Sequence, residues 1–260
     1  MVSLSTQQDF RKVQGLPFCY WCGEKFTTAN GPTRDHLPPK RAFAVEDRQP
    51  CLWLQAHQEC NGGHSPVDQL IVELIGLKWG RRQAEGDRAM LISMFSPHQA
   101  AITNLDIRAA VWRWVRGFHA ALYREWMPEK PIRYTLETPF PSAANTALPE
   151  IEPIRPAHRN FVHEIKTQRL LQNLDRITSN NGKLTYESVW CKFRDADVWA
   201  CVLALNIYDW KDLGMTSGQP PRGCVGSYIL PSELPPVGAT HMKITSIIIP
   251  SIDRLDAFAP

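Results

Sequence analysis

Two pairs of metal-ligand residues stand in the first quarter of the chain. Cys19 and Cys22 form a C-x-x-C in FCYWCGEKF, and His57 and Cys60 form an H-x-x-C in QAHQECN. Each pair has the spacing of a zinc knuckle, and two such pairs supply the four ligands of a closed, structural tetrahedral site. We therefore expect these four side chains to bind one structural Zn²⁺. The alternatives are two unrelated cysteine turns, or Cys51 in place of His57.

A second polar group lies between and just after these pairs. The stretch TRDHLPPKRAF contains Asp35 and His36, and Asn61 directly follows the second zinc pair. A zinc clamp would bring these segments together, and Asp and Asn oxygens suit a hard cation such as Mg²⁺ or Mn²⁺. A neutral histidine beside such an ion suits removal of a proton from water near neutral pH. The prolines after His36 predict a stiff, extended loop.

Two further residues of this group have more than one interpretation. Asp68 stands three residues after Ser65 in SPVDQLIVELIGL, where a capping-box acid reaches back to the start of a helix. We favour this capping role over metal binding. His64 assists the metal, binds a phosphate, or has no part in the site.

Composition bounds the class of protein and its surroundings. A chain of 260 residues with 43% hydrophobic and 21% charged residues is typical of a globular protein, and a net charge of +3 requires any basic surface to be local. Arg34, Lys40 and Arg41 flank the acid and histidine and are candidates for nucleic-acid binding, although a solvated charge is the simpler interpretation of each. The seven cysteines and the absence of a signal peptide or a long apolar run predict a cytoplasmic protein without a membrane segment.

The elements that must position these residues divide the chain in two. We expect a metal-rich module over residues 1–80, built of turns and short strands, and an α+β region over 81–260 with helices to about 180 and strands after. Residues 107–126 have helical spacing, with an apolar stripe that includes Trp126 and with solvated arginines that include Arg113 and Arg116.

The later segments carry further predictions. A Pro-rich connection is expected over 128–156, a helix from 157 to about 180, and a hairpin formed by KLTYESVWCKF and VWACVLALNIY. The stretch MKITSIIIP is a further strand candidate. The remaining cysteines lack paired spacing, so we expect buried core thiols at Cys191, Cys201 and Cys224. Lysine and arginine after residue 77 could extend a basic track, at Lys78, Arg81, Arg82 and Arg88.

The stretches CYWCG (19–23), RDHLPPK (34–40) and HQECN (57–61) together resemble the HNH nucleases, whose ββα-metal fold is often tied together by a zinc knuckle. The similarity is closest to a subgroup with an (E/D)-H-(V/L)-P-P-K signature, a C-x-x-C-N knuckle and a Ser-x-x-acid helix start. It is specific over residues 1–80 and weak beyond them.

The resemblance implies roles for individual residues. His36 matches the general base, Asp35 the metal-binding acid before it, and Asn61 the last letter of the motif, which binds the same ion. It also implies a structural Zn²⁺, a catalytic Mg²⁺ or Mn²⁺, and hydrolysis of DNA to 5′-phosphate and 3′-hydroxyl ends. Nucleases of phage defence or mobile elements that work beside a partner protein are the implied setting.

The chain departs from this pattern at two places. His57 replaces the usual cysteine, and the middle asparagine, which braces the loop carrying the base, has no counterpart in DRQPCLWLQAHQEC. Two alternatives therefore stay open: a non-catalytic zinc module that binds nucleic acid or a protein partner, and a ribonuclease. A protein partner or a homo-oligomer is compatible with either alternative.

Overall fold

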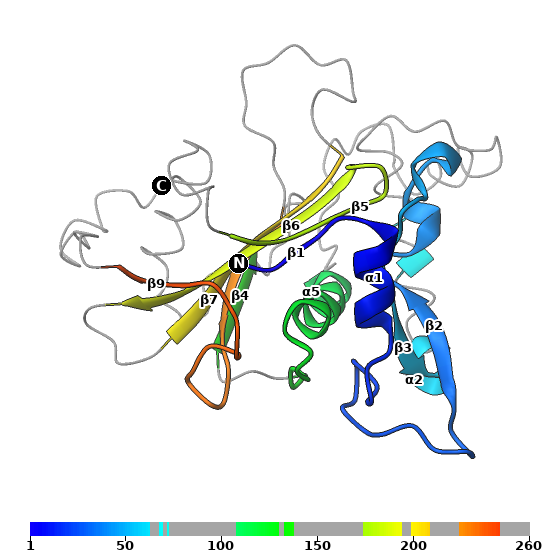
Figure 1. Ribbon diagram of the computed structural model, residues 1–260, viewed down its shortest axis with the longest axis horizontal. Coiled ribbons are helices and arrows are strands. Elements are labelled where there is room, and N and C mark those ends of the chain that lie inside the picture. The colour runs from blue at the N-terminus through cyan, green and yellow to red at the C-terminus, as the bar shows by residue number, and fades with distance from the viewer. Residues whose placement is uncertain are drawn as a thin grey trace, which may run out of the picture.

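Helices and strands are mixed in this protein, and Figure 1 shows two β-sheets with helices between them. The computed structural model describes residues 1–62, 68–69, 72, 108–129, 133–137, 174–193, 199–208 and 224–244. The predicted α+β class is confirmed. Within the described residues, no helix has the length and apolar character needed to span a membrane.

The larger sheet has seven strands and contains both ends of the described chain. Its hydrogen-bonded order is β1-β5-β6-β7-β8-β4, and β9 pairs in parallel with β6. The neighbours from β5 to β4 are antiparallel, whereas β1 pairs in parallel with β5. The strands are β1 (Ser3–Leu4), β4 (Arg133–Glu137), β5 (Asp175–Ser179), β6 (Leu184–Phe193), β7 (Trp199–Ile207), β8 (Cys224–Ile229) and β9 (His241–Ile244).

The predicted hairpin forms the centre of this sheet. β6 and β7 pair over nine positions, from Leu184 opposite Ile207 to Lys192 opposite Trp199. Residues 200–205 of β7 are all buried, and because successive side chains point to opposite faces, both faces of the sheet are covered at this strand. Cys191, Cys201 and Cys224 are buried on β6, β7 and β8, as predicted for core thiols.

The smaller sheet carries the candidate site. β2 (Pro32–His36) and β3 (Trp53–His57) are antiparallel, with Asp35 opposite Leu54 and His36 opposite Trp53. The short helix α2 (Gln58–Gly62) follows β3 directly. The loop that joins β2 to β3, residues 37–52, contains two single 3₁₀ turns, Lys40–Ala42 and Val45–Asp47. We call this connection the His36 loop.

Helix α5 (Arg108–Tyr123) lies between the two sheets, with α1 (Gln7–Gln14) beside it (Figure 1). α5 follows the predicted helix 107–126 closely. Its sheet-facing aromatic residues are packed against the large sheet, and the ring centroids of Phe118 and Tyr186 are 4.8 Å apart. One core is therefore continuous from the first module through α5 to the sheet.

Three local predictions differ from the structure. α1 falls where only turns and brief strands were expected, and a capping box between Thr6 and Asp9 starts it. β4 lies inside the expected Pro-rich connection. Asp175–Ser179 is strand β5 and not the end of a helix, because pairing with β6 outweighs the helical pattern before it.

Candidate functional site

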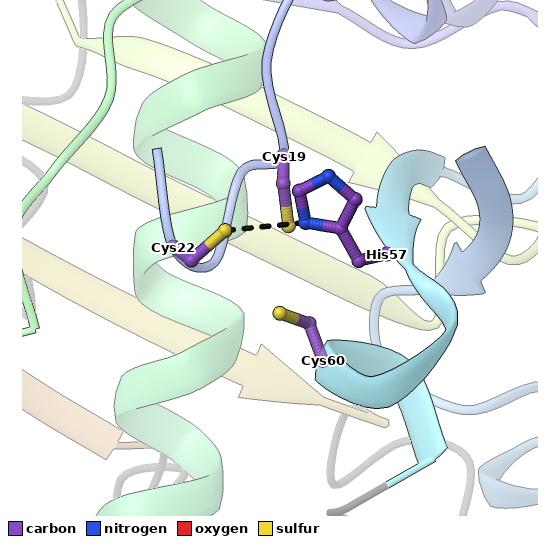
Figure 2. Close-up of side chains that lie close together, drawn as sticks. All are labelled: Cys19, Cys22, His57 and Cys60. Carbon is purple, nitrogen blue, oxygen red and sulfur yellow. Dashed lines mark hydrogen bonds between the residues drawn. The ribbon is translucent and has the colours of Figure 1, made fainter. Parts of the chain in front are cut away.

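The four predicted zinc ligands come together in one cluster. The ligand atoms of Cys19, Cys22, His57 and Cys60 all lie within 4.8 Å of one another. Figure 2 shows the four side chains converging, with Cys22 Sγ 3.3 Å from His57 Nδ1. Three sulfur atoms and one imidazole nitrogen form a ligand set suited to tetrahedral zinc, so the cluster could hold a metal ion such as zinc. Cys51 is a buried free cysteine outside this cluster.

Three local structures position the four ligands. Cys19 and Cys22 lie in one turn, which we call the zinc turn. Two hydrogen bonds close it, from the Cys19 amide to the Glu24 carbonyl and from the Gly23 amide to the Cys19 carbonyl, each 2.9 Å long. Gly23 has a φ of +84°, and the Trp126 indole occupies the space where a Cβ would point. His57 ends β3 and Cys60 lies on α2.

Burial and close contact between the thiols favour their protonated form when no metal ion is bound. Burial, and then the neighbouring thiols, raise the pKa of Cys60 to about 12, and burial raises that of Cys22. Several protonated thiols must therefore lose their protons together when zinc binds, so zinc affinity will depend on pH.

Asp35 is buried in a polar network and does not face solvent. Tyr20, which lies between two zinc ligands, donates from its hydroxyl to Asp35 Oδ2 at 2.5 Å. Arg113 of α5 donates Nη2 to the same oxygen and Nη1 to Asp68 Oδ2, the latter at 2.8 Å. The Nε of Arg113 also donates to the Tyr20 hydroxyl at 3.1 Å. One guanidinium thus joins the zinc turn, strand β2 and Asp68.

The pKa directions in this network follow from burial and charge. Burial raises the pKa of Asp35, although the charge of Arg113 opposes this shift. Burial alone would lower the pKa of Arg113, but Tyr20, Asp35 and Asp68 outweigh it and raise the pKa. Arg113 therefore stays charged and neutralises part of the carboxylate pair.

The predicted solvation of two α5 arginines is wrong. Arg113 and Arg116 are each only 1% exposed. Arg116 donates to the backbone carbonyls of Trp21 and Met127, and its guanidinium carbon lies 4.0 Å above the Trp21 ring. Both arginines face the metal-rich module because they are three residues apart, on one side of the helix. Trp126, predicted in the apolar stripe, is 38% exposed after the helix has ended.

His36 is the last residue of β2 and is half-buried. Since side chains alternate along a strand, His36 and the neighbouring Asp35 point to opposite faces. Burial, followed by the charges of Lys40 and Arg34, lowers the pKa of His36 to about 4. The imidazole is therefore neutral at physiological pH. Arg34, on the same face, lies with its guanidinium carbon 4.8 Å from the Trp53 ring centroid.

Asn61 reaches strand β2 from α2. Its side-chain amide donates to the Arg34 carbonyl at 3.1 Å and to Thr33 Oγ1 at 3.3 Å. These contacts place Asn61 next to the backbone that carries Asp35 and His36. Asp35 and Asn61 are expected to share one ion, but they have different hydrogen-bond partners. Asp35 accepts from Tyr20 and Arg113. Asn61 donates to Thr33 and to the Arg34 carbonyl.

Other site residues divide into exposed, paired and undescribed ones. Arg34, Lys40 and Arg41 are exposed around the end of β2. Asp68 accepts from Arg113, and its predicted capping partner Ser65 lies outside the described residues, as do His64, Lys78, Arg81, Arg82 and Arg88.

Sequence reasoning missed Tyr20 and Arg113 as partners of Asp35. The only signal was an arginine pair spaced i, i+3 in a helix that is otherwise mostly apolar, at WRWVRGF. Nothing local identifies its acidic partners, which lie 78 and 45 residues away. Comparison of the chain with protein-family models, curated proteins and solved structures found no match.

Proposed function

We propose that the N-terminal module is a metal-dependent endonuclease that hydrolyses phosphodiester bonds of DNA, with His36 as general base. The observation that carries this proposal is the half-buried imidazole at the end of β2, flanked by exposed cations and lying on the same two-stranded sheet as the candidate zinc ligand His57, at the opposite end of the ladder. A structural metal site at one end of the small sheet would supply a rigid frame, and an unprotonated histidine at the other end would supply a proton acceptor.

His36 would take a proton from the attacking water. The water oxygen then bonds to phosphorus, the bond from phosphorus to the 3′ oxygen breaks, and the 3′ oxygen takes up a proton from solvent, which leaves 5′-phosphate and 3′-hydroxyl ends. A phosphodiester bound nearby carries negative charge, and this would raise the His36 pKa from about 4 toward neutrality. A base whose pKa approaches the working pH transfers protons efficiently.

Asp35 and Asn61 are the oxygen ligands in this proposal. The Asp35 bonds to Tyr20 and Arg113 both use Oδ2, so Oδ1 is the carboxylate atom left for an ion. The amide nitrogen of Asn61 is bonded to β2, which leaves its oxygen as the ligand atom. Because Asp35 and His36 point to opposite faces, a Mg²⁺ or Mn²⁺ held by these oxygens would have to lie at the edge of β2 to stabilise the charge on the phosphate that His36 serves.

The exposed cations around His36 fit a phosphate backbone. Arg34 shares the face of His36, and Lys40 and Arg41 begin the first 3₁₀ turn of the His36 loop. Positive side chains at these positions would hold the strand by its phosphates, without sequence preference. Binding should therefore weaken as salt concentration rises.

A plasmid-nicking assay tests the proposal. Full-length protein with bound zinc should nick supercoiled DNA when Mg²⁺ or Mn²⁺ is added, and His36→Ala should lower the rate by at least about a hundredfold. The matched control is His241→Ala, since His241 is an exposed histidine on β9. Cleavage that survives His36→Ala would exclude His36 as the base.

One observation favours a second function, a non-catalytic zinc module that binds nucleic acid or a protein partner. Arg113 neutralises Asp35, so the acid is already paired without a metal ion. Salt-dependent DNA or RNA binding by a protein that shows no metal-dependent cleavage of either would support this alternative. RNA substrates in the same assay would identify a ribonuclease.

A further inference from the structure

The His36 loop is held by residues of the large sheet. The backbone amide of Asn180 donates to the Pro50 carbonyl at 2.6 Å, and the side-chain amide of Asn181 donates to Asp47 Oδ1 at 3.2 Å. From the end of β7, the Tyr208 hydroxyl accepts from the Ala44 amide at 2.9 Å. Three hydrogen bonds therefore connect the sheet to the middle and the end of the loop.

The residues that make these bonds are themselves well fixed. Asn180 and Asn181 form the β5–β6 turn and both have a φ of +55°, a left-handed conformation that asparagine tolerates better than most residues. The turn is closed by a bond from the Lys183 amide to the Asn180 carbonyl at 3.0 Å. The Tyr208 amide in turn donates to the Lys183 carbonyl at 2.5 Å, so turn and tyrosine form one unit.

The residues of the His36 loop that meet the turn are also fixed by burial and packing. Asp47 is only 7% exposed, and a buried carboxylate needs hydrogen-bond donors. The Phe43 ring packs at 5.8 Å from the Tyr208 ring, centroid to centroid. At the start of the loop, the Leu37 amide bonds to the Leu52 carbonyl at 3.1 Å. A shift of the turn would therefore be transmitted along the loop to the residue that follows His36.

We propose that Asn181, the Asn180 amide and Tyr208 are positioning residues that fix the His36 loop and, through it, His36. They contact neither the proposed substrate nor the ion, and act only on the shape of the loop. This inference rests on the proposed nuclease function. It makes the large sheet a required part of the candidate site.

Reversing the donor and acceptor of one bond tests the proposal in the zinc-loaded full-length chain. Asn181→Asp places a carboxylate against the Asp47 carboxylate and keeps a residue type that tolerates the same backbone. We expect kcat for nicking to fall about tenfold, with little change in KM, because the base is misplaced and the phosphate contacts are intact. Adding Asp47→Asn recreates an amide–carboxylate bond and should restore kcat to within about threefold of wild type.

Two further variants complete the test. Tyr208→Phe removes the acceptor for the Ala44 amide but keeps the ring against Phe43, and it should lower kcat about fivefold. The matched control for added charge is Asn30→Asp, on an exposed turn of the first module, which should leave kcat unchanged. An Asn181→Asp variant with wild-type kcat, or no rescue by Asp47→Asn, would overturn the proposal.

Amide hydrogen exchange separates this inference from the nuclease proposal. Asn181→Asp should raise exchange over residues 37–52 and leave residues 19–24 of the zinc turn protected. If the wild-type protein does not cleave nucleic acid, the nuclease proposal fails and the exchange result alone decides whether the sheet braces the loop. Unchanged exchange over residues 37–52 would overturn the brace.

Discussion

The zinc cluster and the His36 loop lie within the same 62 residues, but different parts of the chain hold them. All four candidate zinc ligands come from residues 19–60, and their spacing is visible in the sequence. The loop and the strand before it are held by Arg113, Asn181 and Tyr208, at sequence separations of 78 to 164 residues. The ligand pairs are local and can be recognised in the sequence, whereas the geometry around His36 depends on the rest of the fold.

Removing a zinc ligand should have the largest effect, because it disturbs both regions together. Cys60→Ser replaces a thiolate by a poor ligand, and Tyr20 in the zinc turn would lose its fixed position against Asp35. Structural zinc contributes on the order of 10 kcal/mol to such sites. We expect loss of bound zinc and of folded structure in residues 1–62, measured by metal analysis and circular dichroism.

The control for this change is Cys51, a buried cysteine outside the cluster. Cys51→Ser alters a thiol outside the cluster, so the protein should keep its zinc and its fold. Zinc retained by Cys60→Ser, or lost from Cys51→Ser, would mean that the ligand set has been assigned wrongly.

Removing Arg113 should disturb the surroundings of Asp35 and leave the zinc cluster intact. Arg113→Met keeps much of the side-chain volume but leaves Asp35 and Asp68 without their cation, and breaking a buried pair costs about 3–5 kcal/mol. Zinc content should stay at one ion per chain, while chemical denaturation shows the loss of stability. Arg124→Met, at an exposed position after the same helix, should cost less than about 1 kcal/mol.

A double variant shows whether charge is the cause. With Asp35→Asn in the same chain, one of the two unpaired carboxylates is gone, and part of the lost stability should return. No recovery in the double variant would mean that Arg113 acts through packing.

The sequence predicts the local features of this molecule well. The C-x-x-C and H-x-x-C pairs predict the metal cluster, an apolar stripe predicts α5, and two strand-like runs predict the β6–β7 hairpin. In each case the spacing within one or two short segments carries the information, and tertiary contacts do not reverse it.

The sequence could not predict which distant residues meet the candidate site. Arg113 looks like a solvated charge on a helix, because its acidic partners are far away in the chain. The missing middle asparagine suggested an unbraced loop, since residues 37–52 contain no asparagine. In the folded chain Asn181 donates to that loop from the large sheet, and only the topology reveals this contact.

Acid pH should weaken the contact between α5 and the large sheet through His119. His119 is fully buried, and burial lowers its pKa to about 3, against about 6.5 in an unfolded chain. Between these values the unfolded chain binds a proton that the folded chain does not, so stability falls as pH drops below 6.5. At pH 5 the loss of unfolding free energy from His119 is about 2 kcal/mol.

His119→Asn isolates this contribution. The shorter amide can still bond to the Tyr228 hydroxyl, which lies 2.8 Å from His119 Nδ1, but it does not titrate. From pH 7 to pH 5, the wild-type protein should lose more unfolding free energy than His119→Asn does. Parallel stability curves for the two proteins would show that His119 is not the group responsible.

The smallest change tests how closely α5 holds the start of the His36 loop. At Gly117 a Cβ would collide with the side chain of Leu37, the buried residue after His36. Gly117→Ala gains about 1 kcal/mol of helix propensity but forces Leu37 to move in a packed core, which costs about 1–3 kcal/mol. We expect a net loss of about 1 kcal/mol with zinc retained, and a lower nicking rate if Leu37 carries His36 with it. Gly15→Ala, where a Cβ meets nothing within 4 Å, should be neutral or stabilising, and equal stability of the two variants would show that α5 does not constrain the loop.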